Sequence, residues 1–120
     1  MKRKIILQCR EYLESLGLTR WNRREWKFND KLLNHNYCIV YDYDKTFMIY
    51  TRTEIRKNVN DKYELFTNSW IDYSSEDLEE FKEKVNKAVD NYKKAAQKIK
   101  ELKAQEDFKN AKGRVQRSSS

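Results

Sequence analysis

The C-terminal third of the chain carries the feature that most constrains its fold, a long helical repeat. No proline or glycine occurs between residue 78 and Gly113, and the apolar residues recur at steps of three and four, as on one helix face. These residues are Leu78, Phe81, Val85, Ala88, Tyr92, Ala95, Ile99 and Leu102. Ser74 or Ser75 can cap the start of the helix. The sequence therefore predicts an amphipathic helix of about 35 residues, about 50 Å long at 1.5 Å per residue.

This helix is longer than a small sheet can cover. A strand in such a sheet spans about 20 Å, so the far half of the apolar stripe needs another partner. Tyr92, Ile99 and Leu102 then pack on the first helix, on a second copy of the chain or on another protein. We therefore treat these three residues as a candidate protein interface, and a homodimer through the C-terminal helix is one expected way to cover them.

The N-terminal segment carries a shorter helical repeat. Apolar residues from Ile5 to Leu16 recur at steps of three and four, which predicts a helix over residues 3–16. Gly17 suits the left-handed residue that closes a helix, and Leu18 is placed to pack back on the last turn. Polar residues interrupt the first apolar run, unlike in a signal peptide, and no later stretch is apolar enough for a membrane span. We expect a cytoplasmic protein that does not bind membranes.

From Trp26 to Trp70 the helical repeat gives way to alternating residues, many of them aromatic or β-branched, whose side chains would point to opposite sides of a sheet. This pattern is typical of strands. The pattern predicts strands over residues 37–43, 47–50 and 63–70. A weaker signal around Trp26 and Phe28 indicates a fourth strand. Short turns rich in Asn and Asp separate these segments, which predicts an antiparallel meander.

The expected fold class is therefore α+β, with an N-terminal helix, a small antiparallel meander of three to four strands and a long C-terminal amphipathic helix. A chain of 120 residues has room for one hydrophobic core. We predict a single domain over residues 1–112. Residues 113–120 are polar and show no periodicity, so we expect a disordered tail there.

Charge dominates the composition. Charged residues make up 38% of the chain, and the net charge is +7 at pH 7. A field of this sign attracts polyanions, and phosphate contacts gain affinity through counterion release. Nucleic acid, either RNA or DNA, is therefore the expected class of partner. Cys9 and Cys38 are too few for the disulfide framework of a small secreted protein, so we expect two buried thiols.

The segment from residue 20 to residue 27 combines cations with aromatic rings. Arginine contacts phosphates through a fork of N–H donors, and tryptophan offers a face on which an unpaired base stacks. The candidate contacts in this segment are Arg20, Trp21, Arg23, Arg24, Trp26 and Lys27. The alternative is that both tryptophans fill the space between the first helix and the sheet, with the arginines in water.

Two further groups extend the candidate surface. Basic residues gather near the end of the long helix, where they either contact a partner or only complement the helix dipole. The candidates among them are Lys94, Lys98 and Lys103. Tyrosines in the predicted strands suit either a stacking platform for bases or an interface with a protein. The candidates among these are Tyr41, Tyr43 and Tyr50.

Groups for catalysis are scarce. His35 is the only histidine and lies in a predicted turn between two asparagines. Asp42 and Asp44 have the spacing of magnesium-binding carboxylates, but the segment 42–45 is more typical of a hairpin turn. The chain has only two glycines and therefore no glycine-rich phosphate loop. We expect no enzyme activity, no cofactor and no metal.

These features favour a non-enzymatic basic protein that binds nucleic acid or a nucleoprotein complex. The alternative belongs to another class of function. It is a small inhibitor from a phage or mobile element, of the anti-CRISPR type, that blocks a host nucleic-acid-processing protein by protein–protein contact. In that case the tyrosines of the sheet and the stripe of the long helix make the contact.

Overall fold

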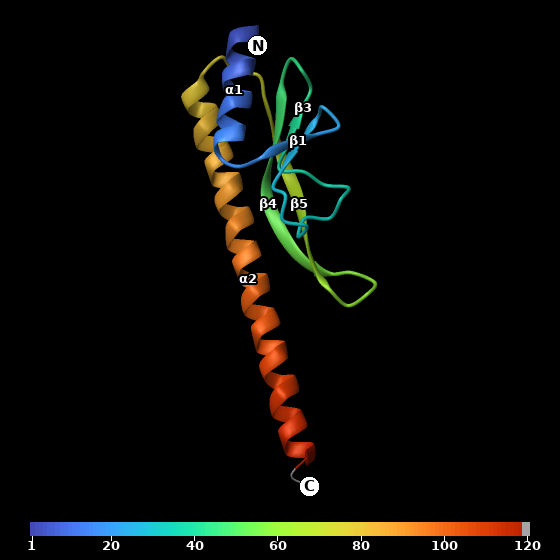
Figure 1. Ribbon diagram of the computed structural model, residues 1–120. Helices are drawn as coiled ribbons and strands as arrows, with labels where there is room; N and C mark the ends of the chain where they lie inside the picture. Colours follow the sequence, from blue (N-terminus) through green and yellow to red (C-terminus); the bar gives the residue numbers. More distant parts are fainter. Residues whose placement is uncertain (119–120) are drawn as a thin grey trace.

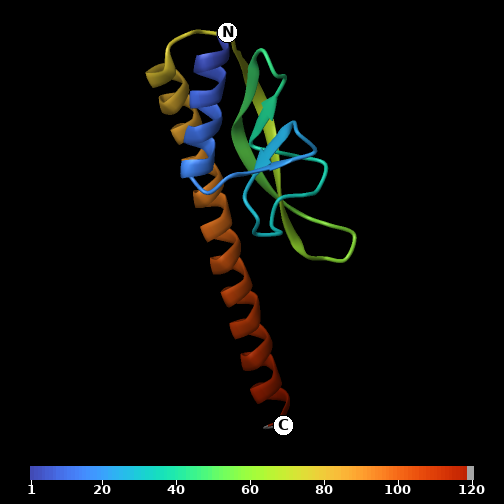
Figure 2. The same ribbon diagram turned by 45° about the horizontal axis from the view of Figure 1, so that its top comes forward.

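The computed structural model describes the backbone of residues 1–118 and the side chains of residues 1–109. The chain forms two layers, with both helices on one side and an antiparallel sheet on the other (Figures 1 and 2). The elements in chain order are α1 (Arg3–Ser15), β1 (Thr19–Trp21), β2 (Glu25–Lys27), β3 (Val40–Asp42), β4 (Phe47–Lys57), β5 (Tyr63–Tyr73) and α2 (Leu78–Ser118). The molecule measures 70 × 24 × 22 Å and is elongated along α2. The fold class is α+β, as predicted.

α1 ends where the sequence predicts. Gly17 has a φ of 89°, in the left-handed region that glycine enters without a steric cost. Its N–H donates to the carbonyl of Glu14 (2.9 Å), and the Leu18 N–H donates to the carbonyl of Leu13 (3.2 Å). Leu18 is buried at this corner and holds the connection to β1 against the core.

The sheet is an antiparallel meander in the order β1-β2-β3-β4-β5, which confirms the predicted topology. It has five strands where three to four were expected. β2 contains Trp26, where the weaker signal indicates a fourth strand, and β1 is the additional one; each of these two strands has three residues. Asn22 and Arg23 adopt positive φ values of 52° and 63°, as a tight hairpin turn of this kind requires. A strand of three residues is too short to show alternation, so hydrophobic periodicity does not reveal β1.

β4 and β5 form a longer hairpin than the sequence indicates. Each strand has 11 residues. At about 3.3 Å per residue such a strand spans about 36 Å, well beyond the expected 20 Å or so. Arg52 and Glu54 occupy the solvent side of the distal half, and their charges end the apolar alternation early. The turn is closed by the Asn58 N–H, which donates to the carbonyl of Lys62 (2.8 Å).

The start of α2 is capped by an aspartate. The Asp77 carboxylate accepts the N–H groups of Glu79 (3.0 Å) and Glu80 (3.2 Å). Ser75, which the sequence indicates as a cap, accepts the Asp77 N–H through its hydroxyl (3.1 Å) and so supports the turn before the helix. The helix still begins at Leu78, as its apolar repeat predicts.

α2 has 41 residues and continues to Ser118, beyond the end expected at residue 112. The polar tail expected over residues 113–120 overlaps its last turns, and residues 119–120 lie outside the described part of the chain. Disorder of this tail stays a prediction. Across the described residues, no helix has the length and apolarity that a membrane crossing needs.

The chain covers most of the α2 stripe by itself. α1 packs beside the first turns of α2 (Figure 2). Farther along, the Phe28 ring stacks on Tyr92 with centroids 5.5 Å apart. Tyr92 and Ile99 are each 1% exposed, and Leu102 is half-buried. Of the expected ways to cover the stripe, Tyr92 and Ile99 are thus covered within the chain and belong to its core, so a protein interface through these two residues would require the fold to uncover them.

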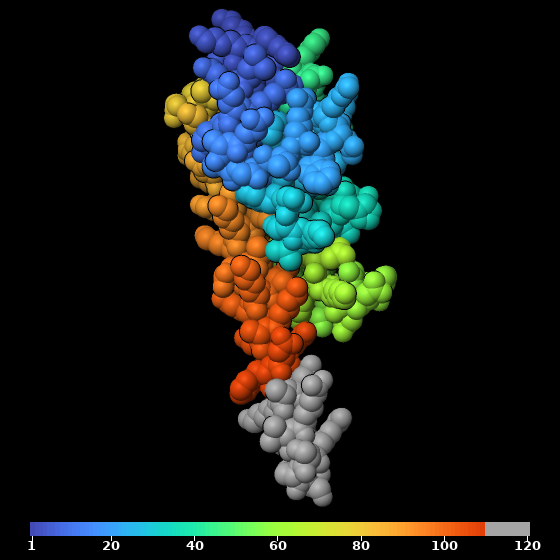
Figure 3. All heavy atoms as spheres, in the orientation of Figure 1, coloured from blue at the N-terminus to red at the C-terminus, as the bar shows by residue number. Residues whose placement is uncertain are grey.

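The distal end of the long hairpin is also tied to α2. The Glu106 carboxylate accepts the Tyr63 hydroxyl (2.8 Å) and the Lys57 ammonium (3.2 Å). In the space-filling view the β4–β5 turn lies beside this part of the helix (Figure 3). The longer hairpin thus reaches the far half of the stripe, and its residues Ile55 and Tyr63 pack against the core that contains Ile99.

Candidate binding surface

The β1–β2 hairpin divides the cationic segment 20–27 between two sides of the sheet. Arg20 pairs with Trp26 across the hairpin, and Trp21 pairs with Glu25. Trp26 is 1% exposed, whereas Trp21 is 45% exposed. Because neighbouring positions on a strand point to opposite sides, Arg20 and Trp26 face the helices and Trp21 faces solvent. The space-filling role considered for both tryptophans therefore holds for Trp26 alone.

Arg20 joins an ion network at the inner side of the hairpin. The side chain of Asp42 is 0% exposed, and its oxygens accept hydrogen bonds from Arg10 of α1 at 2.9 and 3.1 Å. The Trp26 indole N–H donates to the same carboxylate (3.3 Å). The Arg20 guanidinium lies 3.6 Å from Asp42 and 3.7 Å from Asp44, and Arg10 contacts Asp44 at 2.9 Å. Two arginines and two aspartates thus balance their charges, which removes Arg20 from the free cationic surface.

The surroundings of Asp42 keep it ionised. Burial alone raises the pKa of this carboxyl, but hydrogen bonds from Arg10, the Asp44 N–H and Trp26 outweigh burial and hold the pKa below its ordinary value of 3.8. The hairpin turn predicted over residues 42–45 is closed by the backbone, where the Tyr43 N–H donates to the carbonyl of Thr46 (3.0 Å). Among the described residues, no group of three or more His, Cys, Asp or Glu side chains is placed to hold a metal ion.

Aromatic side chains line the side of the sheet that faces away from the helices. Trp21 pairs with Glu25, and Glu25 pairs with Tyr41. Met48 continues this row on β4, and Tyr50 pairs with Trp70 two residues farther along. Because direct partners in antiparallel strands point to the same side, these residues share one surface. We call this surface the aromatic face, and it consists of Trp21, Tyr41, Tyr43, Met48, Tyr50 and Trp70.

The rings of the aromatic face contact one another and stay open to solvent. Ring centroids lie 4.7 Å apart for Tyr41 and Tyr43, and 6.2 Å apart for Tyr50 and Trp70. The exposed fractions are 45% for Tyr43 and 59% for Trp70. Burial, with smaller contributions from nearby groups, raises the pKa of Tyr50, so its hydroxyl remains a donor at neutral pH. Exposed apolar patches of this kind mark interaction sites.

Two carboxylates on this side of the sheet are already paired. The Lys27 ammonium lies 3.9 Å from Glu25 and also 5.5 Å from the centroid of the Trp21 ring. Arg56 binds Glu54 at 2.7 Å, and this hydrogen bond lowers the pKa of Glu54. Asp72, the direct partner of Met48 across the strands, adds a further exposed carboxylate to this side.

Three arginines near the aromatic face carry no such partner. Arg23 and Arg24 are exposed at the tip of the β1–β2 hairpin, and Arg52 is exposed on β4. Within the part of the chain whose side chains are described, none of the three forms an ion pair. They are the guanidinium groups of this region that remain open to an anion.

The three predicted lysines of α2 do not form one site. Lys94 and Lys98 are exposed and lie four residues apart, so they share a flank of the helix. Lys103 lines a polar hollow of 430 Å³ together with Tyr63 and Glu106. Only the first two lysines therefore remain candidates for a common contact.

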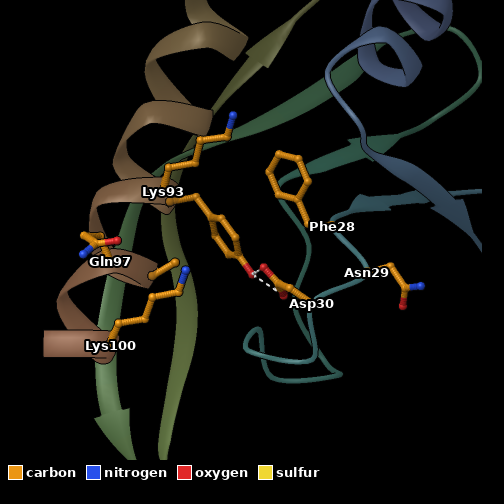
Figure 4. Close-up of a pocket in the computed structure, with 8 residues that line it drawn as sticks. Phe28, Asn29, Asp30, Lys93, Gln97 and Lys100 are labelled. Carbon is orange, nitrogen blue, oxygen red and sulfur yellow. Dashed lines mark hydrogen bonds between the residues drawn. The ribbon is translucent and has the colours of Figure 1, made fainter. Parts of the chain in front are cut away.

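A hollow of 460 Å³ lies between α2 and the segment after β2 (Figure 4). The stacked rings of Phe28 and Tyr92 line it, and Lys93 and Lys100 border it. The Tyr92 hydroxyl lies 2.9 Å from both carboxylate oxygens of Asp30. Burial, followed by this hydrogen bond, raises the pKa of Tyr92 above its usual range. The polar groups at the base of the hollow thus hold the loop to the helix.

The thiols and the histidine lie in different environments. Cys9 and Cys38 are free and buried, as predicted. Burial raises the pKa of each thiol to about 12, so both are protonated at neutral pH and are poor nucleophiles. His35 is exposed, and its backbone carbonyl accepts a hydrogen bond from Lys27 (3.3 Å).

Sequence reasoning missed two residues of the aromatic face, Met48 and Trp70. Each precedes a residue of the sheet that packs toward the helices, Ile49 and Ile71 respectively, so each points to the opposite side. This alternation was a usable signal in the sequence. It identifies a second side of the sheet but not whether a further layer covers that side.

The fold and this surface together define a two-layer α+β protein with an open aromatic face on its sheet. No protein-family model, no curated protein and no solved structure matches this chain. A function therefore has to be inferred from the side chains and their geometry.

Proposed function

We propose that this protein binds single-stranded nucleic acid, RNA or DNA, through the aromatic face and acts by binding alone. The observation that carries the proposal is the exposure of Trp21, Tyr43 and Trp70 on one side of the sheet. An unpaired base stacks on an open ring whatever its identity, and each such stack contributes about 1–3 kcal/mol. The bases of a duplex are stacked on one another, so a single strand is the form that fits this surface.

Charge around the face supports the same partner. The exposed guanidinium groups of Arg23, Arg24 and Arg52 can bind phosphate oxygens through paired N–H donors. The net charge of +7 adds long-range attraction that weakens with salt. Arg20 is left out of this proposal because Asp42 and Asp44 already balance its charge.

A protein partner is the second candidate, and the centre of the aromatic face favours it. Met48 lies among the aromatic rings, and methionine and aromatic side chains are enriched at protein interfaces. Asp72 is paired directly with Met48 across the strands, where its carboxylate repels a phosphate. A nucleic-acid-processing protein bound here is blocked by occupation of its surface, and such a contact tolerates salt better than a phosphate contact does.

The test measures the affinity of labelled oligo(dT) and oligo(U) by fluorescence anisotropy. The probes have about 20 nucleotides, longer than the usual site of about 4–16 for one small domain. Trp21→Ala and Trp70→Ala should each weaken binding about 5- to 150-fold, the equivalent of one lost stack. Phe108→Ala is the matched control, because this aromatic residue is 68% exposed but lies on α2, in a hollow lined by residues of that helix.

The outcomes separate the two candidates. If all three variants bind the oligonucleotide with equal affinity, the aromatic face does not take part in nucleic-acid binding. If neither oligonucleotide binds at low salt, the nucleic-acid function is excluded. A protein partner is then supported by a purified complex that survives nuclease and high salt and is lost in the Trp70→Ala variant.

A further inference from the structure

α2 carries a line of lysines on one flank. Lys84, Lys87, Lys94 and Lys98 follow one another at helical spacing, so they lie along a single line on its surface. At about 1.5 Å per residue, the line is about 21 Å long. Asn91 fills the remaining position of the line between Lys87 and Lys94, and Asp90 lies beside it, three residues from Lys87 and four residues from Lys94.

The start of this line borders a hollow of 240 Å³ between α2 and the sheet. Lys84, Lys87 and Asn91 form the helix side of the hollow, and Thr51 and Ile71 form the sheet side. The Asn91 side chain donates to the carbonyl of Thr51 (2.8 Å), which fixes this flank of the helix next to the sheet. The lysines are therefore held beside an accessible groove.

β5 separates this groove from the aromatic face. It is the last strand of the sheet, and it carries Trp70 and Ile71 in succession. Consecutive residues of a strand point to opposite sides, so Trp70 belongs to the aromatic face while Ile71 lines the groove. A nucleic-acid strand that stacks on Trp70 therefore reaches the lysines by passing round the edge of the sheet at β5.

The lysines of this line are available for a new anion. Among the residues with described side chains, Lys87 pairs with Glu83 at 3.7 Å and Lys98 pairs with Glu101 at 3.9 Å, and all four groups are more than half exposed. Exposed pairs of this kind contribute about 0–1 kcal/mol. A phosphate that brings several ammonium groups together can therefore displace them.

We infer that this line, the lysine rail of Lys84, Lys87, Lys94 and Lys98, binds the phosphodiester backbone of the same single strand whose bases stack on the aromatic face. The inference rests on the proposed function and assigns a path to the strand, from the aromatic face over the edge at β5 and along α2. Charge complementarity carries it, because the rail presents four ammonium groups in a row, two of them at the groove beside the sheet, and the carboxylates next to them are exposed and only weakly paired.

The test compares two double variants of one helix. Lys84→Glu with Lys87→Glu reverses the start of the rail. Lys93→Glu with Lys100→Glu is the matched control, with the same change in net charge on the flank that borders Phe28. Each variant is measured with whichever of oligo(dT) and oligo(U) the wild type binds more tightly, at about 20 nucleotides and at about 5 nucleotides, a length that covers little more than the aromatic face. Thermal unfolding checks the fold, and Lys84→Gln with Lys87→Gln replaces the first variant if it does not fold.

The rail variant should weaken binding of the long probe at least about tenfold at physiological salt. The slope of log affinity against log salt should fall by about 1.4, at about 0.7 for each lost phosphate contact with a single strand. The short probe should change less than about twofold, and the control should change the long probe less than about threefold, since only the general field is altered.

Three results overturn the inference. The first is an equal loss in the rail and control variants, and the second is an equal loss for the short and long probes, because both indicate a general field effect. The third is wild-type protein that binds neither probe, which also ends the proposed function. If Trp70→Ala weakens binding while the rail variant does not, the proposed function stands and the rail alone is rejected.

Discussion

The Arg10 side chain of α1 binds both carboxylate oxygens of Asp42 on β3, although 32 residues separate the two in the chain. The Asp42 side chain is 0% exposed and that of Arg10 is 10% exposed, so the pair connects the helical layer to the sheet in a place that water barely reaches. The Trp26 indole N–H donates a hydrogen bond to the same Asp42 carboxylate, and the Arg20 guanidinium forms an ion pair with it. The inner side of the β1–β2 hairpin is therefore organised by this one contact.

Asp42→Ala should destabilise the protein by about 3 kcal/mol, because it leaves the nearly buried Arg10 charge with only the exposed Asp44 as a partner. Asp44→Ala removes a carboxylate that is 67% exposed, so we expect a loss of less than about 1 kcal/mol. Urea unfolding of the two variants measures the difference. Similar small losses for both would show that the remaining aspartate and water together compensate the Arg10 charge.

Stability should also fall in acid through Asp42. Burial raises the pKa of this carboxyl, but its hydrogen bonds lower the pKa more, so the folded value lies below 3.8. The stabilisation is therefore present above the unfolded pKa and is lost as the pH falls through the folded pKa. Urea unfolding between about pH 5 and about pH 2 should show the free-energy difference between wild type and Asp42→Asn shrinking toward low pH. A constant difference would contradict the lowered pKa.

Ile99→Ala tests whether the far stripe of α2 lies in the core of the chain. Ile99 is 1% exposed, so the variant should lose about 2–5 kcal/mol through lost burial and an unfilled cavity. Phe108→Ala, at a residue that is 68% exposed, should change stability by less than about 0.5 kcal/mol. Thermal unfolding of dilute protein checks both, and a neutral Ile99→Ala variant would mean that this part of the helix is covered only in a complex.

Gly17→Ala should cost about 1–2 kcal/mol, because an L-residue is strained in the left-handed region. The φ of Gly17 is 89°, and an added Cβ lies 3.7 Å from the Phe28 ring, an ordinary contact. Backbone strain is therefore the expected cause and not a clash. Gly17→Asn should recover part of the loss, since asparagine tolerates this region better than alanine does. Equal losses for the two variants in urea unfolding would point to sterics.

Cys9 and Cys38 should resist thiol reagents in the folded protein. Burial raises the pKa of each thiol to about 12, so little thiolate is present at pH 8 and reagents have poor access. Absorbance with a disulfide reagent should show no reaction within minutes for native protein and two reacting thiols after unfolding. Rapid labelling of either residue in native protein would contradict its buried position.

Local patterns in the sequence predict the helices and the turns well. The apolar repeat that ends at Leu102, the cap at Gly17 and the turn over residues 42–45 each depend on residues close together in the chain. The hydrogen bonds of a helix join residues only four apart, so a short stretch of sequence contains all the residues that form it. The strands around Phe47 and Tyr63 are recognisable for the same reason, because alternation repeats every two residues.

Only the tertiary structure decided which of these groups meet. The sequence alone places Arg20, Trp21 and Trp26 in one candidate segment, but the register of the β1–β2 hairpin sends Trp21 outward and the other two inward. Likewise, Asp42 is a turn residue by its neighbours and becomes the centre of an ion network once α1 packs against β3. Contacts between residues distant in the chain depend on how the layers pack, which no local repeat records. The aromatic face is open to solvent because both helices cover the other side of the sheet.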